Sequence, residues 1–267
     1  MTDLSIIIVS HNTRGDLERC LASIHDSRPA LSHEIIVVDN ASSDGSGSAA
    51  RRWKDVRVID AGANLGFAAG NNIGIRASAG ENLLLLNSDT VVPAGAIDGL
   101  LGVLGAHPEA AVVGPRLVDE HGRAELSFGP IMSLLSELRQ SRLVRGHERR
   151  DPVISRRVEE MTRREQWPDW VSGACLLVRR ADAEAVGLLD ERYLMYAEDV
   201  DFCAAIRARG RRVLFAPAVE VVHLRGRSAA TAPAATREAY YQSHLAFYEK
   251  HHPLVAPLVR LYRLFRS

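Results

Sequence analysis

Strand and helix patterns alternate along residues 4–118, and this alternation constrains the fold more than any other feature of the sequence. Short apolar runs, typical of strands that are buried on both faces, are separated by segments with apolar residues at helical spacing. The pattern predicts an α/β fold with a mostly parallel central sheet that is flanked by helices. The expected strands cover residues 4–10, 33–40, 56–60, 81–89 and 110–118, and the expected helices cover residues 12–24, 67–78 and 93–107.

Polar side chains follow three of these strands at the point where each strand ends. Residues 10–12 (Ser-His-Asn) follow the first strand, Asp39 and Asn40 follow the second, and residues 87–89 (Asn-Ser-Asp) follow four leucines. Ligands of open parallel sheets bind beyond the carboxyl ends of the strands. A carboxylate at such an end is costly to ionise unless it meets a cation or a cap. We therefore expect one ligand site at these three ends, although the same residue types are also common helix caps and turn residues.

The second half of the chain has a less regular pattern. Residues 139–165 are rich in arginine and poor in apolar periodicity, which predicts a mobile or surface segment. Residues 169–180 and 212–224 predict further strands, and residues 196–210 predict a helix that ends at Gly210.

The carboxyl-terminal region predicts a linker and a basic amphipathic tail. Residues 228–236 are of low complexity, and from Thr236 the chain is helical in pattern and rich in basic and aromatic residues. We expect a single Rossmann-like domain over residues 1–230, followed by the linker and tail over residues 231–267. The tail, like residues 128–144, predicts either a helix that lies on an anionic membrane or one that packs on the domain.

The charge balance and the cysteines limit the partners and the compartment. The chain has 33 basic and 33 acidic residues, so no global field favours nucleic acid. Cys20, Cys175 and Cys203 lie far apart without the spacing of a metal site or a disulfide framework, which fits a reducing cytosol. No basic leader precedes the first apolar run, and no run reaches the ~20 apolar residues of a membrane span. We expect a cytoplasmic protein, in solution or at the inner face of the plasma membrane.

Seven short stretches together carry a resemblance to a known family. They are VSHN (9–12), VVDNASSDGS (37–46), NLGFAAGNNIGI (64–75), LLNSDT (85–90), WVSGACLLVRR (170–180), YAEDVDFC (196–203) and VVHLRGRS (221–228). In this order they resemble the family-2 glycosyltransferases of the GT-A fold, most closely the rhamnosyltransferase-like branch. The resemblance implies an inverting, metal-dependent transfer of a sugar from a nucleotide donor to a hydroxyl group in cell-surface polysaccharide synthesis. It favours dTDP-L-rhamnose as the donor, with a UDP-sugar such as a galactofuranosyl or N-acetylglucosaminyl donor as the alternative.

The resemblance also implies a nucleotide site. Asp39 matches the aspartate that accepts a hydrogen bond from the pyrimidine N3–H, a group that uracil and thymine carry. Asn64, Gly66 and Phe67 match a stretch that packs near the nucleotide. Asn87 replaces the first aspartate of the family's Asp-x-Asp motif, and it offers an oxygen without a charge to the metal or to the ribose. The implied nucleotide-binding residues are Ser10, Asn12, Asp39, Asn64, Gly66, Phe67, Asn72 and Asn87.

A divalent metal, a general base and a sugar pocket are implied in the same way. Asp89 and His223 would bind Mn²⁺ or Mg²⁺, and an imidazole ligand suits Mn²⁺ better. Asp199 would remove the proton of the acceptor hydroxyl, with Glu198 and Asp201 as neighbouring carboxylates that the helix dipole also stabilises. The implied sugar pocket comprises Trp170, Ser172, Gly173, Ala174 and Glu198.

The implied partners are a nucleotide sugar of the dTDP or UDP type and a glycan or lipid-linked saccharide acceptor. A lipid-linked diphosphate would suit the arginines of residues 139–164, because guanidinium groups pair well with phosphate. Two other classes of protein are alternatives: a non-catalytic nucleotide- or glycan-binding module, and a nucleotidyltransferase. The first has no use for a general base, and the second should carry a glycine-rich, lysine-bearing loop that residues 9–16 lack.

Overall fold

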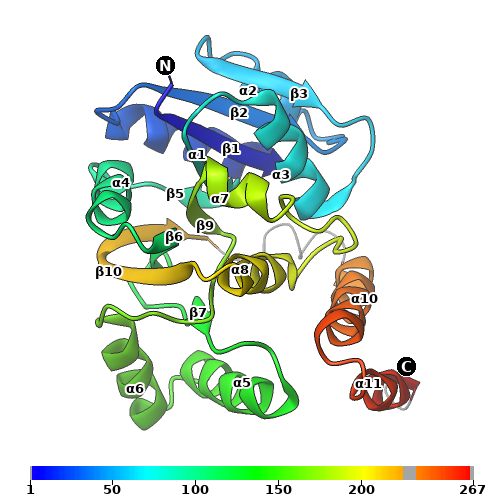
Figure 1. The fold of residues 1–267 in the computed structure, drawn as a ribbon. Helices are drawn as coiled ribbons and strands as arrows, with labels where there is room; N and C mark the ends of the chain where they lie inside the picture. Colours follow the sequence, from blue (N-terminus) through cyan, green and yellow to red (C-terminus); the bar gives the residue numbers. More distant parts are fainter. Residues whose placement is uncertain (1, 225–232, 265–267) are drawn as a thin grey trace.

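The structure is a computed structural model, and it describes residues 2–224 and 233–264. Its centre is an eight-stranded sheet in the order β3-β2-β1-β4-β9-β6-β10-β5, with helices on both faces (Figure 1). The sheet strands are β1 (Leu4–Ser10), β2 (His33–Asp39), β3 (Val56–Asp60), β4 (Asn82–Asn87), β5 (Thr90–Val91), β6 (Ala110–Val118), β9 (Cys175–Arg179) and β10 (Arg212–His223). The helices are α1 (Arg14–Ser27), α2 (Ser46–Ala50), α3 (Gly66–Ala77), α4 (Ala96–Ala106), α5 (Leu134–Glu148), α6 (Pro152–Thr162), α7 (Arg180–Ala185), α8 (Glu198–Ala208), α10 (Pro233–His251) and α11 (Ala256–Leu264).

Parallel pairing dominates the half of the sheet that contains the first four strands. β1 pairs in parallel with β2 and with β4, and β2 pairs in parallel with β3. The register places Ser10 opposite Asp39 and Val9 opposite Asn87, so the three strands end at one edge. β9 runs antiparallel between β4 and β6, which makes the sheet mixed. The predicted α/β fold with a mostly parallel sheet is confirmed.

The continuous apolar character of the strands follows from burial on both faces. In β1, Ile6 and Ile8 belong to the core that contains Leu17 of α1, whereas Ile7 belongs to the core that contains Ile75 of α3. Alternate residues of a strand point to opposite faces, so a strand between two helix layers needs an apolar residue at every position.

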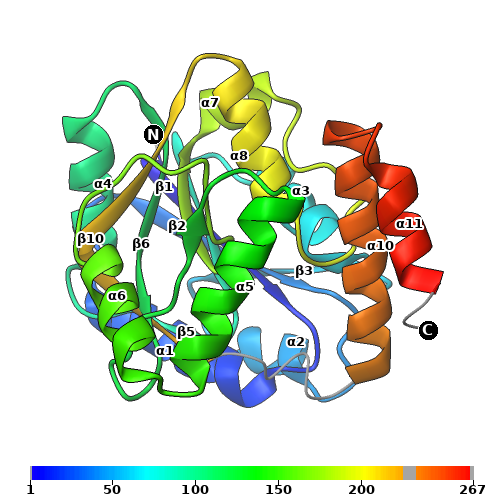
Figure 2. The same cartoon turned by 90° about the horizontal axis from the view of Figure 1, so that it is seen from below.

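Residues 139–165, predicted as a mobile or surface segment, form helices. They contain most of α5 and all of α6, which lie on the surface as predicted (Figure 2). Ser133 caps α5 in a capping box, and Asp151 caps α6 in front of Pro152. Few of their residues are buried: Gly146 in α5, and Val158 and Thr162 in α6.

The segment 169–180, predicted as one strand, is divided in two. β8 (Trp170–Val171) pairs with β7 (Phe128–Gly129) in a separate two-stranded sheet, and β9 enters the main sheet. Residues 172–174 connect the two strands, and they lie at the site described below.

The carboxyl-terminal helices pack on the rest of the chain. Phe247 and Tyr248 of α10 are buried in a cluster with Tyr193 and with Val200 of α8. The expected domain boundary at residue 230 falls within residues 225–232, outside the described residues, and stays a prediction. The same holds for the linker expected at residues 228–236, except that residues 233–236 belong to α10. Within the described ranges, no helix combines the length and the apolar character that crossing a membrane requires.

Candidate active site

Hydrogen bonds join the ends of β1 and β4. Ser10 Oγ lies 3.0 Å from Thr13 Oγ1, which lies 2.9 Å from Ser88 Oγ, and all three residues are buried. The Asn40 N–H donates to the Ser10 carbonyl at 2.8 Å and joins the end of β2 to the same edge. The predicted meeting of the three polar strand ends is therefore present in the structure.

Asp39 is held by backbone groups at the tip of β2. Its Oδ1 accepts a hydrogen bond from the Ser42 N–H at 3.1 Å, and only 8% of the residue is exposed. Its Oδ2 lies against Gly47 of α2, where a Cβ atom would overlap with that oxygen. Gly47 was not among the predicted site residues, but any larger residue there would displace the Asp39 carboxylate.

Asn40 organises the loop that precedes α3. Its Nδ2 donates to Asn64 Oδ1 at 3.0 Å and to the Gly66 carbonyl at 3.1 Å, while its Oδ1 accepts from the Leu65 N–H. Gly66 has a φ of +85°, and a Cβ there would overlap with the Leu194 carbonyl. Asn64, just before α3, and Gly66 and Phe67, the first two residues of α3, are thus held from the end of β2 on one side and from residue 194 on the other.

Two predicted nucleotide-binding residues have partners inside the fold. The Asn12 amide oxygen accepts from the Ser43 N–H at 2.8 Å, and this bond fastens the loop after β1 to the loop after β2. The buried amide of Asn72 donates to the Leu189 carbonyl and to Glu191, and its oxygen accepts from the Leu189 N–H. Asn72 therefore fixes residues 189–191, and we do not include it in the proposed nucleotide contacts.

His223 lies between two carboxylates at the end of β10. Its Nε2 is 3.3 Å from Asp89 Oδ1, and its Nδ1 is 3.1 Å from Glu125 Oε2. Burial alone would lower the pKa of His223, but hydrogen bonds to Asp89 and Glu125 outweigh it and raise the pKa to about 9. The sequence predicted Asp89 and His223 together but missed Glu125, which lies in a loop without a recognisable motif.

The donor chemistry of this group fits a divalent ion that is shared with a diphosphate. Within residues 2–224 and 233–264, no three His, Cys, Asp or Glu side chains are arranged to hold a metal on their own. Asp89 and His223 offer one carboxylate and one imidazole, and Mg²⁺ sites commonly combine one or two carboxylates with substrate phosphates. Glu125 holds the other ring nitrogen, as carboxylates do for metal-bound histidines. Asn87 precedes Asp89 at the same strand end, and its N–H donates to the Ala174 carbonyl.

Helix α8 begins with three carboxylates whose surroundings differ. Asp199 Oδ2 accepts from the Gly173 N–H at 2.9 Å, and Oδ1 accepts from the Val200 N–H at 2.8 Å. Burial raises the pKa of Asp199, although these backbone hydrogen bonds counteract part of the effect. Burial and the Asp199 charge raise the pKa of Glu198 to about 8. Glu198 Oε2 is buried, and nothing in the described part of the chain donates to it.

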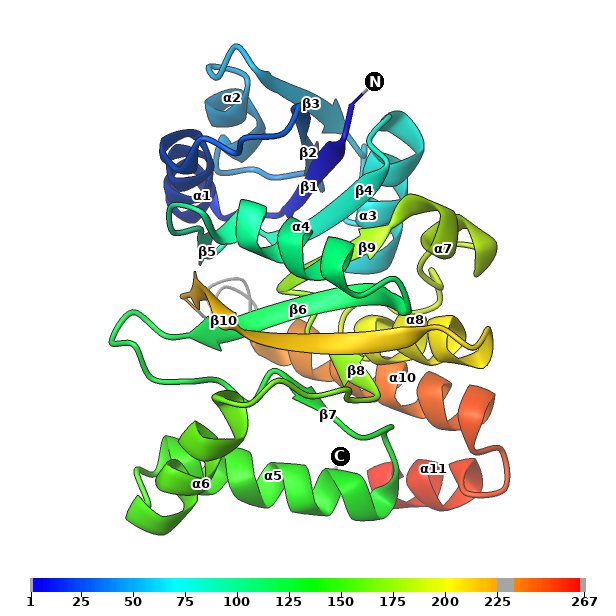
Figure 3. The same cartoon turned by 60° about the vertical axis from the view of Figure 1, so that its left-hand side comes forward.

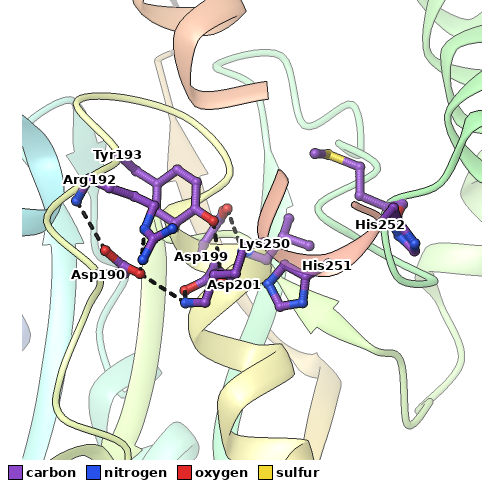
Figure 4. Close-up of polar contacts among 10 residues, drawn as sticks. Asp190, Arg192, Tyr193, Asp199, Asp201, Lys250, His251 and His252 are labelled. Carbon is purple, nitrogen blue, oxygen red and sulfur yellow. Dashed lines mark hydrogen bonds and ion pairs between the residues drawn. The ribbon is translucent and has the colours of Figure 1, made fainter. Parts of the chain in front are cut away.

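Asp201 is engaged by Tyr193 and by two residues of α10. Its carboxylate accepts from the Tyr193 hydroxyl at 3.2 Å and contacts Lys250 Nζ at 2.8 Å and His251 Nε2 at 2.6 Å (Figure 4). Lys250 also contacts Asp190 at 2.9 Å. These contacts join α8 to α10.

The segment between β8 and β9 places Gly173, one of the predicted sugar-pocket residues, beside Asp199 and Phe67. A Cβ at Gly173 would lie 3.2 Å from the Phe67 ring and 3.4 Å from Asp199 Cβ. This glycine therefore lies between Phe67 and Asp199, with little room for a side chain. The Ser172 hydroxyl accepts from the Ala174 N–H at 3.3 Å. The remaining predicted residue, Trp170, donates its indole N–H to the Pro130 carbonyl at 2.9 Å.

Comparisons with known proteins decide the family. The model of "Glycosyl transferase family 2" matches residues 5–183, which is more than half of the chain. The chain belongs to glycosyltransferase family 2. It is a glycosyltransferase, and the resemblance seen in the sequence is confirmed. Membership in this family argues against the two alternatives, a non-catalytic binding module and a nucleotidyltransferase.

Curated relatives support the same branch of the family. The N-acetylglucosaminyl-diphospho-decaprenol L-rhamnosyltransferase of Mycobacterium tuberculosis is 33% identical, over 94% of this chain and 86% of the relative. The low-salt glycan biosynthesis hexosyltransferase Agl10 of Haloferax volcanii is 28% identical, over 84% of this chain and 67% of the relative.

Among solved structures, the mannosyltransferase PcManGT of Pyrobaculum calidifontis, in complex with GDP-Man and Mn²⁺, superposes with a TM-score of 0.64. It is 19% identical, and the match covers 97% of this chain and 70% of that one. At this identity the likeness shows the fold alone, which is the GT-A fold expected from the sequence.

Proposed function

We propose that this glycosyltransferase moves L-rhamnose from dTDP-L-rhamnose to a hydroxyl group of a glycan or lipid-linked saccharide, with inversion at the anomeric carbon. The observation that carries the proposal is the Asp199 carboxylate, which the Gly173 N–H holds beside Phe67. The choice of rhamnose follows the 33% identical relative, whose name gives L-rhamnosyl transfer.

The nucleotide would lie across the joined strand ends. Asp39 offers an acceptor for the pyrimidine N3–H, and its fixed carboxylate requires no rearrangement to do so. The residues at the start of α3, Asn64, Gly66 and Phe67, form the neighbouring wall. Ser10, Asn12 and Asn87 lie at or just after the ends of β1 and β4. This arrangement supports a thymine or uracil nucleotide over a cytosine nucleotide.

Asp199 acts as the general base in a single displacement. Its carboxylate takes the proton of the acceptor hydroxyl as that oxygen attacks the anomeric carbon. The new glycosidic C–O bond forms while the bond to the nucleotide diphosphate breaks, and the diphosphate leaves with the electron pair. The raised pKa of Asp199 suits this role, because a base works best when its pKa approaches the working pH. Glu198 offers its buried carboxyl group to a sugar hydroxyl, and Ser172, Gly173, Ala174 and Trp170 shape the pocket.

Asp89 and His223 would hold the divalent ion, Mn²⁺ or Mg²⁺. The ion supplies charge neutralisation to the diphosphate leaving group, which therefore needs no proton. Glu125 would keep a proton on Nδ1 of His223 and so leave Nε2 free to hold the ion.

The acceptor and the place of action follow from the same relative. Its name specifies an N-acetylglucosaminyl-diphospho-decaprenol acceptor, which is a saccharide on a membrane lipid. We propose an acceptor of this class for the present chain, with the enzyme at the cytoplasmic face of the plasma membrane. A UDP-sugar donor is the second candidate, because Asp39 would accept from uracil as well as from thymine.

A donor screen tests this proposal. Purified protein is incubated with Mn²⁺, a synthetic N-acetylglucosaminyl diphospholipid and one nucleotide sugar at a time, and the released nucleotide diphosphate is measured. We expect release of dTDP from dTDP-L-rhamnose that depends on the acceptor. Acceptor-dependent release from UDP-sugars alone would replace the rhamnosyl assignment with the second candidate.

A further inference from the structure

Six exposed leucines lie in α5, in α11 and in the turn before α11, at one end of the molecule. The exposed fraction is 94% for Leu254, 69% for Leu135, 66% for Leu138 and 62% for Leu258. Leu134 and Leu261 are also exposed. The two sides of α11 differ. Ala256 and Val259 are buried against the rest of the chain, whereas Leu258 and Leu261 are exposed.

The two segments are neighbours in space. Ile131 and Met132, just before α5, pack against the cluster that contains Ala256 and Val259. His252 Nε2 lies 2.8 Å from the Met132 carbonyl. Figures 1 and 3 both place α5 and α11 at the lower end of the molecule. The exposed leucines of α5 and α11 thus belong to one end of the fold.

Arginines without counter-charges continue this surface along α5. Arg139, Arg142 and Arg145 are exposed, and they form no ion pair with any residue in the described ranges. Other helices of this protein pair their arginines within the helix: Arg156 with Glu160, for example, and Arg180 with Glu184. We name these three arginines and the six leucines the leucine–arginine face.

We propose that the leucine–arginine face binds the surface of a bilayer that contains anionic lipids. Apolar side chains gain free energy when they leave water for the acyl boundary, and unpaired arginines beside them attract anionic headgroups. A protein partner of ordinary composition would satisfy the leucines but not this excess of positive charge. Charge complementarity therefore favours the anionic bilayer as the occupant.

Two ion pairs connect the leucine–arginine face, through α10, to helix α8. Glu137 of α5 contacts His244 of α10 at 2.9 Å, and Lys250 of α10 contacts Asp201 of α8 at 2.8 Å. Asp199 stands two residues before Asp201 on α8. Binding to a bilayer through this face would therefore fix the orientation of the cleft relative to the membrane. The inference goes beyond the proposed transfer reaction, because membrane binding is measurable without donor or acceptor.

Vesicle sedimentation of the full chain tests the inference. We expect binding to vesicles of phosphatidylglycerol and phosphatidylcholine at least ~10-fold stronger than to phosphatidylcholine alone, and weaker binding as the salt concentration rises. The double variant Leu254→Glu/Leu258→Glu should lose at least ~10-fold in affinity for the anionic vesicles, and Arg139→Gln/Arg142→Gln should lose the preference for them. Leu31→Glu, at an exposed leucine between α1 and β2, is the matched control and should bind like the native chain.

Three results would overturn the inference. In the first, the native chain does not bind anionic vesicles. In the second, both double variants bind these vesicles as well as the native chain does. In the third, the native chain binds no vesicles but forms a dimer in light scattering, and the leucine variant is a monomer. Circular dichroism establishes that each variant is folded. Nucleotide diphosphate release with a soluble acceptor analogue, measured without vesicles, separates failure of this inference from failure of the proposed reaction.

Discussion

Asp199 and Asp201 stand two positions apart at the start of α8, yet their carboxylates have different surroundings. Asp199 accepts only backbone N–H groups, from Gly173 and Val200, whereas Asp201 contacts Tyr193, Lys250 and His251. The sequence predicted Asp199 as the base, but it could not separate these residues because two of the Asp201 partners, Lys250 and His251, come from about fifty positions further along the chain.

The first prediction concerns this base. Asp199→Asn should lower turnover by ~10²–10⁴-fold while the affinity for the nucleotide sugar stays near its native value, because the amide keeps the shape and removes the basicity. Turnover is measured by nucleotide diphosphate release, and donor affinity by calorimetry. The matched variant Asp201→Asn should keep far more turnover. If Asp201→Asn is the inactive variant and Asp199→Asn is not, Asp199 is not the base.

The second prediction concerns Glu198. Its pKa is about 8 in the folded protein and 4.5 in the unfolded chain, so the folded state holds this proton more tightly. Stability must then fall as the pH rises from about 4.5 to about 8, and Glu198→Gln removes this loss. The melting temperature of the variant should exceed that of the native protein by a margin that grows over this range, at about 2–4 °C for each kcal/mol. Equal pH dependence of the two melting curves would refute the assigned pKa.

The third prediction concerns Asp89. Asp89→Ala should abolish transfer and remove the Mn²⁺ dependence of donor binding in calorimetry, because it takes away the carboxylate that would face the ion. Asp119→Ala, in an exposed turn, is the control and should leave both unchanged. Full activity of the native protein in EDTA would contradict the proposed metal.

At the scale of elements, the contact between α8 and α10 shows what the sequence pattern could and could not predict. The pattern from Thr236 onward predicted a helix, which α10 is, but left open whether it packs on the domain or lies on a membrane. The structure shows that α10 packs, since Phe247 and Tyr248 are buried. α6 was missed as a helix, and α5 was predicted only in part, through the amphipathic segment 128–144; each of the two helices buries only one or two residues.

The fourth prediction belongs to this contact. Phe247→Ala should lower the free energy of unfolding by about 3–5 kcal/mol, since Phe247 of α10 is fully buried in the cluster that contains Tyr193 and Val200 of α8. Tyr240→Ala, at a half-exposed position of the same helix, should change it by less than about 1 kcal/mol. Denaturant unfolding measures both. Equal effects of the two substitutions would mean that α10 does not pack on α8 in solution.

At the scale of the whole molecule, the sheet and the meeting of its polar strand ends followed from the sequence. Buried parallel strands leave little freedom in where their carboxyl ends lie, so Ser10, Asp39 and Asn87 could be placed at one edge in advance. The partners that come from distant loops could not. Glu125 reaches His223 across 98 positions, and Leu189 reaches Asn72 across 117 positions, and neither pairing leaves a local pattern.

The anomeric configuration of the product shows whether the transfer is a single displacement. The purified chain is supplied with dTDP-L-rhamnose, Mn²⁺ and a synthetic N-acetylglucosaminyl diphospholipid, and the anomeric proton and carbon of the product are measured by nuclear magnetic resonance. A single displacement assisted by Asp199 predicts a rhamnosyl product whose anomeric configuration is opposite to that of the donor, and the same product in much smaller yield with Asp199→Asn. A product with the donor's configuration, or no rhamnosyl product from a folded enzyme that transfers another sugar, would contradict the account.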